Sequence, residues 1–256
     1  MIELSKEEMY CLIPLCEGHS DVELWACIEG NMGRAWVDRK DKPSIAMIVV
    51  ADFCYLLGWT EDTNTKFAIK ELLEQFKRKI IISHSNYGAS VVDKYFPNNH
   101  KKYSRYAIKK ESEVFQRDKL KSYIDVVESK FFIEKIDVSN YNMVLEDEFM
   151  ADCCCYYSSL EEFLKNGIGY VIIHEGEIIA GASSYSYCKG SIDITIGTKK
   201  EYRQKGLALA CASKLILDCL DKNIYPRWDA ANLESVALAE KLGYHFEKEY
   251  EVYSIY

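Results

Sequence analysis

No stretch of this 256-residue chain reaches the roughly eighteen consecutive apolar residues needed to span a bilayer. The opening residues, MIELSKEEMY, lack the basic and then apolar order of a signal peptide. A dense block of Lys and Arg is also missing, and the formal net charge is −8, which argues against a nucleic-acid binder. These features predict a cytoplasmic protein that acts neither on nucleic acid nor in a membrane.

The spacings typical of metal sites are missing too. The ten cysteines and five histidines form no CxxC or HxxxH pair, although zinc sites usually need such pairs. This holds for the triplet Cys153, Cys154 and Cys155 as well. The cysteines are irregularly spaced and no secretion signal accompanies them, so we expect reduced, partly buried thiols and no structural metal.

What the chain does contain is typical of a globular protein, with 48% hydrophobic and 28% charged residues. The alternation of strand and helix patterns predicts an α/β (α+β) fold in two halves, residues 1–125 and 126–256. In the first half, GRAWVD, SIAMIVV and DFCYLLG, between residues 33 and 58, predict a small meander of strands. Each half has several strands, then a helix, a strand, a helix and a strand. This similarity indicates either an internal duplication or a chance agreement between two common orders of elements.

A short turn between a strand and a helix carries the clearest chemical signal. The alternating run SIDITIGT precedes EYRQKGLALACASKLIL, where an apolar stripe at helical spacing predicts a helix from about Gln204 to Asp221, with Cys211 and Cys219 in the buried stripe. The N-terminus of a helix has unpaired N–H groups that attract anions. Gly206 leaves the main chain bare, Ala208 is small, and Arg203 and Lys205 add positive charge. The pattern fits a diphosphate site, but by itself it also fits an ordinary helix start with a flexible glycine.

The phosphate-binding patterns GxGxxG and GxxxxGK[ST] are absent, whereas residues 126–256 resemble the GNAT superfamily of acetyl-CoA-dependent N-acetyltransferases. The resemblance rests on a strand, the motif [RQ]xxGx[GA] and a helix, here TIGTKKEYRQKGLALA, followed by a single predicted strand at YPRWDA and by NLESVALAEKLGY. The two-halved layout is similar to a subfamily of the zwittermicin A resistance type, whose enzymes acetylate amine antibiotics for self-protection. The resemblance implies a mixed, splayed β-sheet flanked by helices, with residues 1–125 as a degenerate GNAT-like repeat on the acceptor side.

The same resemblance implies that acetyl-CoA is the co-substrate. The backbone amides of 204–208 would hold its pyrophosphate, and the strand edge around Ile196 and Thr198 would bond its pantetheine arm. Asn232 and Ser235 would contact the far end of the arm, although capping of the last helix explains Asn232 equally well. The expected coenzyme-binding residues are Ile196, Thr198, Arg203, Gln204, Lys205, Gly206, Leu207, Ala208, Asn232 and Ser235.

Two carboxylates are candidates for the base that acetyl transfer to an amine needs. GNAT enzymes often carry a carboxylate on the strand before the pyrophosphate turn, which is Asp193 here. A solvated strand residue is the alternative interpretation of Asp193. Asp229 lies at the end of the strand that leads to Asn232, where ligands of open α/β sheets bind. A turn or capping acid is the alternative for Asp229.

The general acid departs from the family pattern, because position 239, where many GNAT enzymes carry a tyrosine, is alanine. Tyr244, Tyr185, Tyr187 or a water can supply the proton, or the thiolate can leave with little help, since a thiol titrates near pH 8.5.

The sequence therefore predicts a monomeric or homodimeric N-acetyltransferase that moves an acetyl group directly to a primary amine of a small molecule. The alternatives are a non-catalytic acyl-CoA-binding or regulatory module and a protein N-acetyltransferase.

Overall fold

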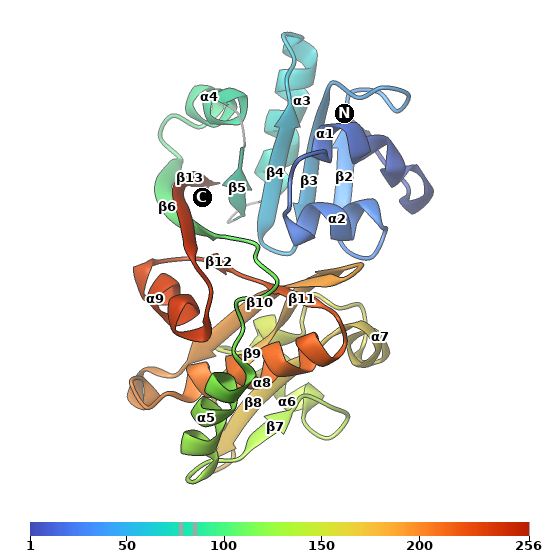
Figure 1. The fold of residues 1–256 in the computed structure, drawn as a ribbon. Coiled ribbons are helices and arrows are strands. Elements are labelled where there is room, and N and C mark those ends of the chain that lie inside the picture. Colours follow the sequence, from blue (N-terminus) through green and yellow to red (C-terminus); the bar gives the residue numbers. More distant parts are fainter. Residues whose placement is uncertain (77–78, 84–85, 256) are drawn as a thin grey trace. The chain divides into compact units, whose positions relative to one another are not determined.

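A computed structural model describes residues 1–76, 79–83 and 86–255 (Figure 1). It divides into two compact units, Met1–Arg105 with Glu249–Tyr256 (the first unit) and Tyr106–Lys248 (the second unit). The expected boundary at 125/126 instead falls inside helix α5 (Arg117–Glu128), which packs against α8 (Leu207–Asp221) of the second unit. The units thus follow spatial contacts, and the end of the chain returns to the first unit.

The first unit begins with β1, which pairs with β2, and with short helices; it continues through an antiparallel β2–β3–β4 meander and then crosses over through α3 to β5, which is parallel to β4. The meander that the sequence predicts between 33 and 58 is confirmed. The end of β13 pairs antiparallel with β5. The elements are β1 (Ile2–Glu3), η1 (Lys6–Leu12), α1 (Ile13–Cys16), α2 (Val22–Ile28), β2 (Arg34–Val37), β3 (Ile45–Val50), β4 (Phe53–Gly58), α3 (Thr63–Gln75), β5 (Ile80–Ile82) and α4 (Asn86–Tyr95). The boundaries between the units fall within two further strands, β6 (His100–Ile108) and β13 (Phe246–Ile255).

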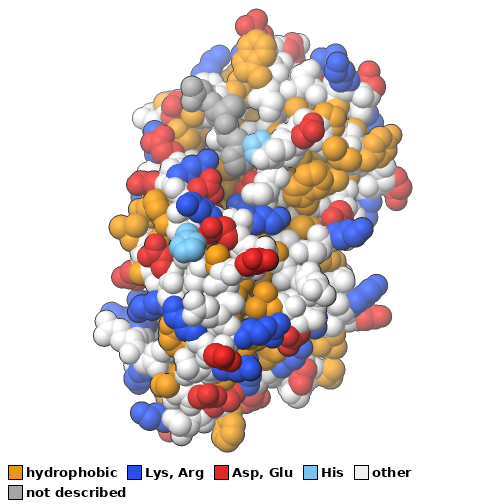
Figure 2. Space-filling model, in the orientation of Figure 1, with side chains coloured by type: hydrophobic (Ala, Val, Ile, Leu, Met, Phe, Trp, Pro, Cys, Tyr) orange, Lys and Arg blue, Asp and Glu red, His pale blue; other side chains and the backbone are white. Residues whose placement is uncertain are grey.

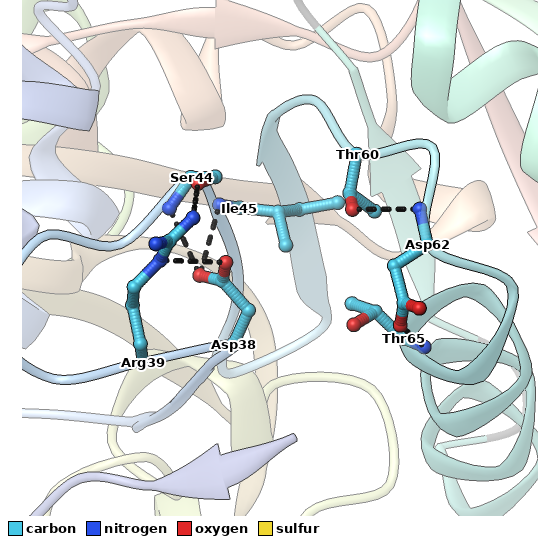
Figure 3. Close-up of polar contacts among 7 residues, drawn as sticks. All are labelled: Asp38, Arg39, Ser44, Ile45, Thr60, Asp62 and Thr65. Atoms are coloured by element: carbon cyan, nitrogen blue, oxygen red, sulfur yellow. Dashed lines mark hydrogen bonds and ion pairs between the residues drawn. The ribbon is translucent and has the colours of Figure 1, made fainter.

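Side-chain carboxylates fix two turns of the first unit (Figure 3). Asp38 accepts hydrogen bonds from the backbone N–H groups of Ser44 and Ile45, at 2.9 and 3.3 Å, and so closes the turn between β2 and β3. Asp62 caps the start of α3 by accepting a 2.6 Å bond from the N–H of Thr65. This bond lowers the pKa of the Asp62 carboxyl.

The second unit contains a sheet in the order β11-β10-β9-β8-β7, antiparallel except for the parallel β10–β11 pair. Residues alternate between its two faces, so that the neighbours Val171 and Ile172 join different apolar clusters. The cluster with Ile172 includes the buried stripe of α8, and the cluster with Val171 includes Met150 and Phe163 from the segments between β7 and β8. The remaining elements are β7 (Ile133–Lys135), α6 (Tyr141–Glu146), η2 (Ala151–Cys153), α7 (Leu160–Asn166), β8 (Gly169–His174), β9 (Glu177–Cys188), β10 (Ser191–Thr198), η3 (Lys200–Tyr202), β11 (Tyr225–Arg227), β12 (Asp229–Ala230) and α9 (Leu233–Leu242).

The surface mixes charges of both signs. On the face shown in Figure 2, Lys and Arg side chains alternate with Asp and Glu rather than gathering into one basic area. Within residues 1–76, 79–83 and 86–255, every helix is too short or too polar to traverse a bilayer. The mixed α+β architecture, with helices against its sheets, is the fold class that the sequence predicts.

Candidate functional site

The candidate site forms where strands β10 and β11 part. They pair only over three positions, Ser191–Asp193 with Tyr225–Arg227. After Trp228 the chain continues as β12, which pairs with β6 instead. The expectation of a single strand over YPRWDA is therefore wrong, because its two ends hydrogen-bond to different partners.

The consequence is a free strand edge. Beyond Asp193, β10 keeps its antiparallel partner β9 as far as Thr198. On its other side, no strand pairs with residues 194–198 in the part of the chain that the structure describes. The side chains also change from buried to half-buried at Thr195. Main-chain groups on such an edge can pair with an extended ligand that carries amides.

The turn after this edge has a bare and uncapped helix start. Gln204 and Gly206 have positive φ values of 62° and 79°, so α8 begins at Leu207 and not at Gln204 as the sequence suggested. Its N-cap residue is Gly206, which has no side chain to cap the helix. The N–H groups of its first turn have no intrahelical partner. A Cβ on Gly206 would find only Val127 Cγ2 within 4 Å, at 3.9 Å.

The groups around this turn fit an anionic, extended ligand. Arg203 and Lys205 are exposed; the Arg203 Nε lies 3.4 Å from the carbonyl oxygen of Thr198, and the Lys205 ammonium lies 4.6 Å from the ring centre of Tyr202. The Oγ1 atom of Thr198 is shielded from solvent and has no hydrogen-bond partner within residues 1–76, 79–83 and 86–255. An uncapped helix start, two cations and an unsatisfied hydroxyl together favour binding of a phosphate-containing ligand.

The corresponding helix of the first unit, α3, lacks these properties. Its first turn is occupied by the Asp62 carboxylate (Figure 3), which accepts the N–H of Thr65. A carboxylate at that position repels a phosphate and uses an N–H group that the phosphate would need. The first unit therefore does not repeat the anion site of the second.

Asn232 and Ser235 lie together at the start of α9. The Asn232 Oδ1 accepts a 2.8 Å bond from the Ser235 N–H, so the capping role predicted for Asn232 is confirmed. The Ser235 Oγ accepts a second bond, 3.0 Å long, from the indole Nε1 of Trp228. Sequence reasoning missed this tryptophan, because nothing in the local pattern links Trp228 to a helix residue seven positions later.

Asp193 lies at the last pair of β10 with β11, opposite Arg227. Its side chain is 5% exposed, so the interpretation as a solvated strand residue is wrong. The pairing with β9 shifts immediately after it, from Ser186 to Ser184, which makes a β-bulge. Bulges are common beside active sites because they redirect side chains, and a single sequence does not reveal them. Asp229 is half-buried at the start of β12.

Tyr244 is held in the core. Its side chain is 1% exposed and its hydroxyl donates a 2.7 Å bond to the carbonyl of Pro226. Burial raises the pKa of this hydroxyl well above its ordinary value. Ala239, at the usual tyrosine position, is also buried. Neither residue presents a proton donor toward solvent.

The other two candidate tyrosines lie on β9. Tyr185 is buried and makes an edge-on contact with Tyr156, with ring centres 4.8 Å apart. Tyr187 is half-buried, and its hydroxyl donates a 2.8 Å bond to the Glu162 carboxylate. Tyr187 is therefore the more exposed residue of the pair, and its hydroxyl also accepts a 3.0 Å bond from the Asn166 amide.

The thiols of α8 do not fit a nucleophilic role. Cys211 and Cys219 are fully buried in the apolar stripe of the helix, as the sequence predicts. Burial raises the pKa of both thiols to about 12, so both remain protonated at neutral pH. No group of three or more His, Cys, Asp or Glu residues in the described ranges is arranged to hold a metal ion.

Known proteins agree with this geometry. A GCN5-related N-acetyltransferase-like protein from Streptococcus suis 89/1591 shares 33% identity with this chain and a TM-score of 0.88, over 98% of this chain and 99% of its own. A tandem GNAT protein from the clavulanic acid biosynthesis pathway shares the fold, with a TM-score of 0.59 at 11% identity over 99% of this chain and 97% of its own.

Sequence comparison points to the same family. The uncharacterised N-acetyltransferase YdfB of Bacillus subtilis strain 168 is 33% identical over 100 residues, a match that spans 38% of this chain and 38% of that protein. The pattern of the GNAT acetyltransferase family matches residues 13–253, nearly the whole chain. With the splayed strands and the bare helix start, this match identifies the chain as a member of the GNAT acetyltransferase family.

Proposed function

We propose that this protein transfers the acetyl group of acetyl-CoA to a primary amine of a small molecule. The observation that carries the proposal is the uncapped start of α8 next to the free edge of β10. One region thus offers both an anion site and main-chain groups for an extended amide ligand. Membership of the family supports acetyl transfer, and the donor and the acceptor class are what we add.

The coenzyme would bind along the second unit. The amides of 204–208 would hold the pyrophosphate, with Arg203 and Lys205 beside them. The edge at Ile196 and Thr198 would bond the pantetheine arm, as main-chain groups do when a strand is added to a sheet. Acetyl-CoA then supplies an activated acyl group as a thioester.

The residues of this chain would orient the amine and move its proton. The amine nitrogen attacks the thioester carbonyl, the new C–N bond replaces the C–S bond, and the thiolate leaves. Asp193, a buried carboxylate where β10 and β11 part, would accept the ammonium proton directly or through a water. Asp229 would help to bind the cationic acceptor. Because Tyr244 is buried in the core whereas Tyr187 is half-buried, we assign the proton of the thiol to Tyr187 or to a water.

We assign coenzyme binding to the second unit and acceptor recognition to the first, as a degenerate repeat of the same fold. The order of elements supports the repeat, because β4–α3–β5–α4–β6 and β10–α8–β11–α9–β13 both run strand, helix, parallel strand, helix, strand, apart from the short η3 and β12 that the second series adds. The capping of α3 by Asp62 accounts for the loss of a second coenzyme site.

A second candidate function, a non-catalytic acyl-CoA-binding module, is favoured by the buried Ala239 and by the hydrogen bond that occupies Tyr244. The experiment is to measure acetyl-CoA binding by calorimetry and then thiol release with pooled amines, polyamines and peptides. Thiol release with small amines supports the proposal, and release with peptides alone indicates a protein N-acetyltransferase. Binding without any release indicates the module, and no binding refutes both.

A further inference from the structure

Trp228 occupies the point at which the two strands separate. It is the residue between β11 and β12, and it is 2% exposed. Its ring packs 5.5 Å from the ring of Tyr244, whose hydroxyl in turn bonds the carbonyl of Pro226 at the end of β11. These contacts hold the indole in the apolar core of the second unit, at the point where the chain leaves β11.

The indole determines which hydrogen bonds Ser235 can make. An indole N–H donates and never accepts, so in the 3.0 Å contact with Trp228 the Ser235 Oγ must be the acceptor. The hydroxyl hydrogen of Ser235 therefore points elsewhere. Among the residues that the structure describes, no hydrogen bond donated by this hydroxyl is found. Ser235 is half-buried, at the start of α9.

The neighbouring cap reinforces this arrangement. The Asn232 Oδ1 is used by the Ser235 N–H, at 2.8 Å, so the part of the Asn232 amide that remains available is its NH₂ group, on an exposed residue. Both side chains at the start of α9 thus offer donors. A pair of donors selects an acceptor, and the acceptors of a pantetheine arm are its amide carbonyl oxygens.

We propose that Trp228 is a positioning residue for the coenzyme, which holds the Ser235 hydroxyl as a donor to an amide carbonyl of the pantetheine arm. The inference rests on the proposed function, because it assumes that acetyl-CoA binds along β10 and α9. A serine hydroxyl rotates freely and often bonds to nearby main chain instead. The indole restricts this rotation before the ligand arrives, and such preorganisation lowers the entropic cost of binding.

The test is a double-mutant cycle of Trp228→Phe and Ser235→Ala, with the dissociation constant of acetyl-CoA measured by calorimetry on the full chain. Phenylalanine keeps a buried ring but removes the N–H group. Each single variant should weaken binding about five- to tenfold, the worth of one hydrogen bond. Because Trp228 acts through Ser235, the double variant should be weakened about five- to tenfold as well, and not by the product of the two effects.

Two controls separate positioning from general damage. Trp36→Phe changes another buried tryptophan, 4% exposed in the first unit, and should leave the dissociation constant unchanged. Adenosine 3′,5′-bisphosphate, which lacks the pantetheine arm, should bind equally to the wild type and to all variants. Ser235→Ala removes a half-buried hydroxyl and the acceptor of the indole N–H, but it keeps the Trp228 ring and the N–H group that Asn232 caps, so it remains informative if Trp228→Phe does not fold.

The outcomes are distinct. Three outcomes would overturn the positioning role and leave the proposed function intact. The losses of acetyl-CoA affinity in the two single variants could multiply in the double variant, both single variants could bind acetyl-CoA as the wild type does, or the variants could lose as much affinity for adenosine 3′,5′-bisphosphate as for acetyl-CoA. Absence of acetyl-CoA binding by the wild type would refute the proposed function, and the inference with it. Non-multiplicative losses limited to the complete coenzyme would support the inference.

Discussion

Replacement of Gly206 tests the candidate site most directly. Gly206 has a φ of 79°, and a Cβ there would meet nothing closer than Val127 Cγ2 at 3.9 Å. Gly206→Leu should therefore fold, at a cost of about 1–2 kcal/mol for the left-handed conformation. The new side chain would cover the main-chain N–H groups that a pyrophosphate needs. We expect the affinity for acetyl-CoA to fall at least about 100-fold, since several charge-assisted hydrogen bonds are lost together.

Thermal and chemical unfolding with and without the coenzyme give the measurement. At a free concentration about 100 times its dissociation constant, a ligand of the native state adds about 2.7 kcal/mol to the free energy of unfolding. At the same concentration, a variant with 100-fold weaker affinity gains only about 0.4 kcal/mol. The readout is therefore the difference between these two gains.

Gly190→Leu is the matched control. Gly190 has a similar φ of 77°, and a Cβ there would meet no atom within 4 Å, but it lies before the first residue of β10, at the end opposite the turn. It should lose the same 1–2 kcal/mol without ligand and keep the full coenzyme-dependent gain. The assignment of the turn would be refuted if Gly206→Leu kept the full coenzyme-dependent gain in stability. It would also be refuted if Gly190→Leu lost as much of that gain as Gly206→Leu.

Two further predictions concern carboxylates. Asp193→Asn should lower the turnover number about 10²- to 10⁴-fold, as expected for a lost general base, with less than about a twofold change in coenzyme affinity; an unaltered rate would exclude Asp193 as the base. Burial opposes ionisation of Asp218, but hydrogen bonds from Lys135, Lys222 and Tyr170 outweigh it and lower its pKa. Its stabilisation is thus present above the ordinary pKa near 4 and lost as the pH falls through the lowered value. Asp218→Asn should cost about 1–2 kcal/mol at pH 7 and progressively less in acid, as urea unfolding at several pH values would show.

The sequence alone determined the elements and the family. Alternating apolar residues at 191–198 and the apolar stripe of α8 are local patterns set by the geometry of a strand and a helix, so they can be read without tertiary contacts. The motif at 203–208 is equally local, because a glycine with positive φ at a helix start depends on its own main chain.

Only the tertiary structure decided how these elements form a site. The parting of β10 and β11 depends on the fact that β11 pairs with β10 whereas β12 pairs with β6. The burial of Asp193 depends on the layers that pack around it. The hydrogen bond from Trp228 to Ser235 depends on the packing of the segment after β11 against α9. The unit boundary moved for the same reason, since α5 packs on α8. Each of these results from contacts between segments distant in the chain, whose free energies are not encoded in any single local pattern.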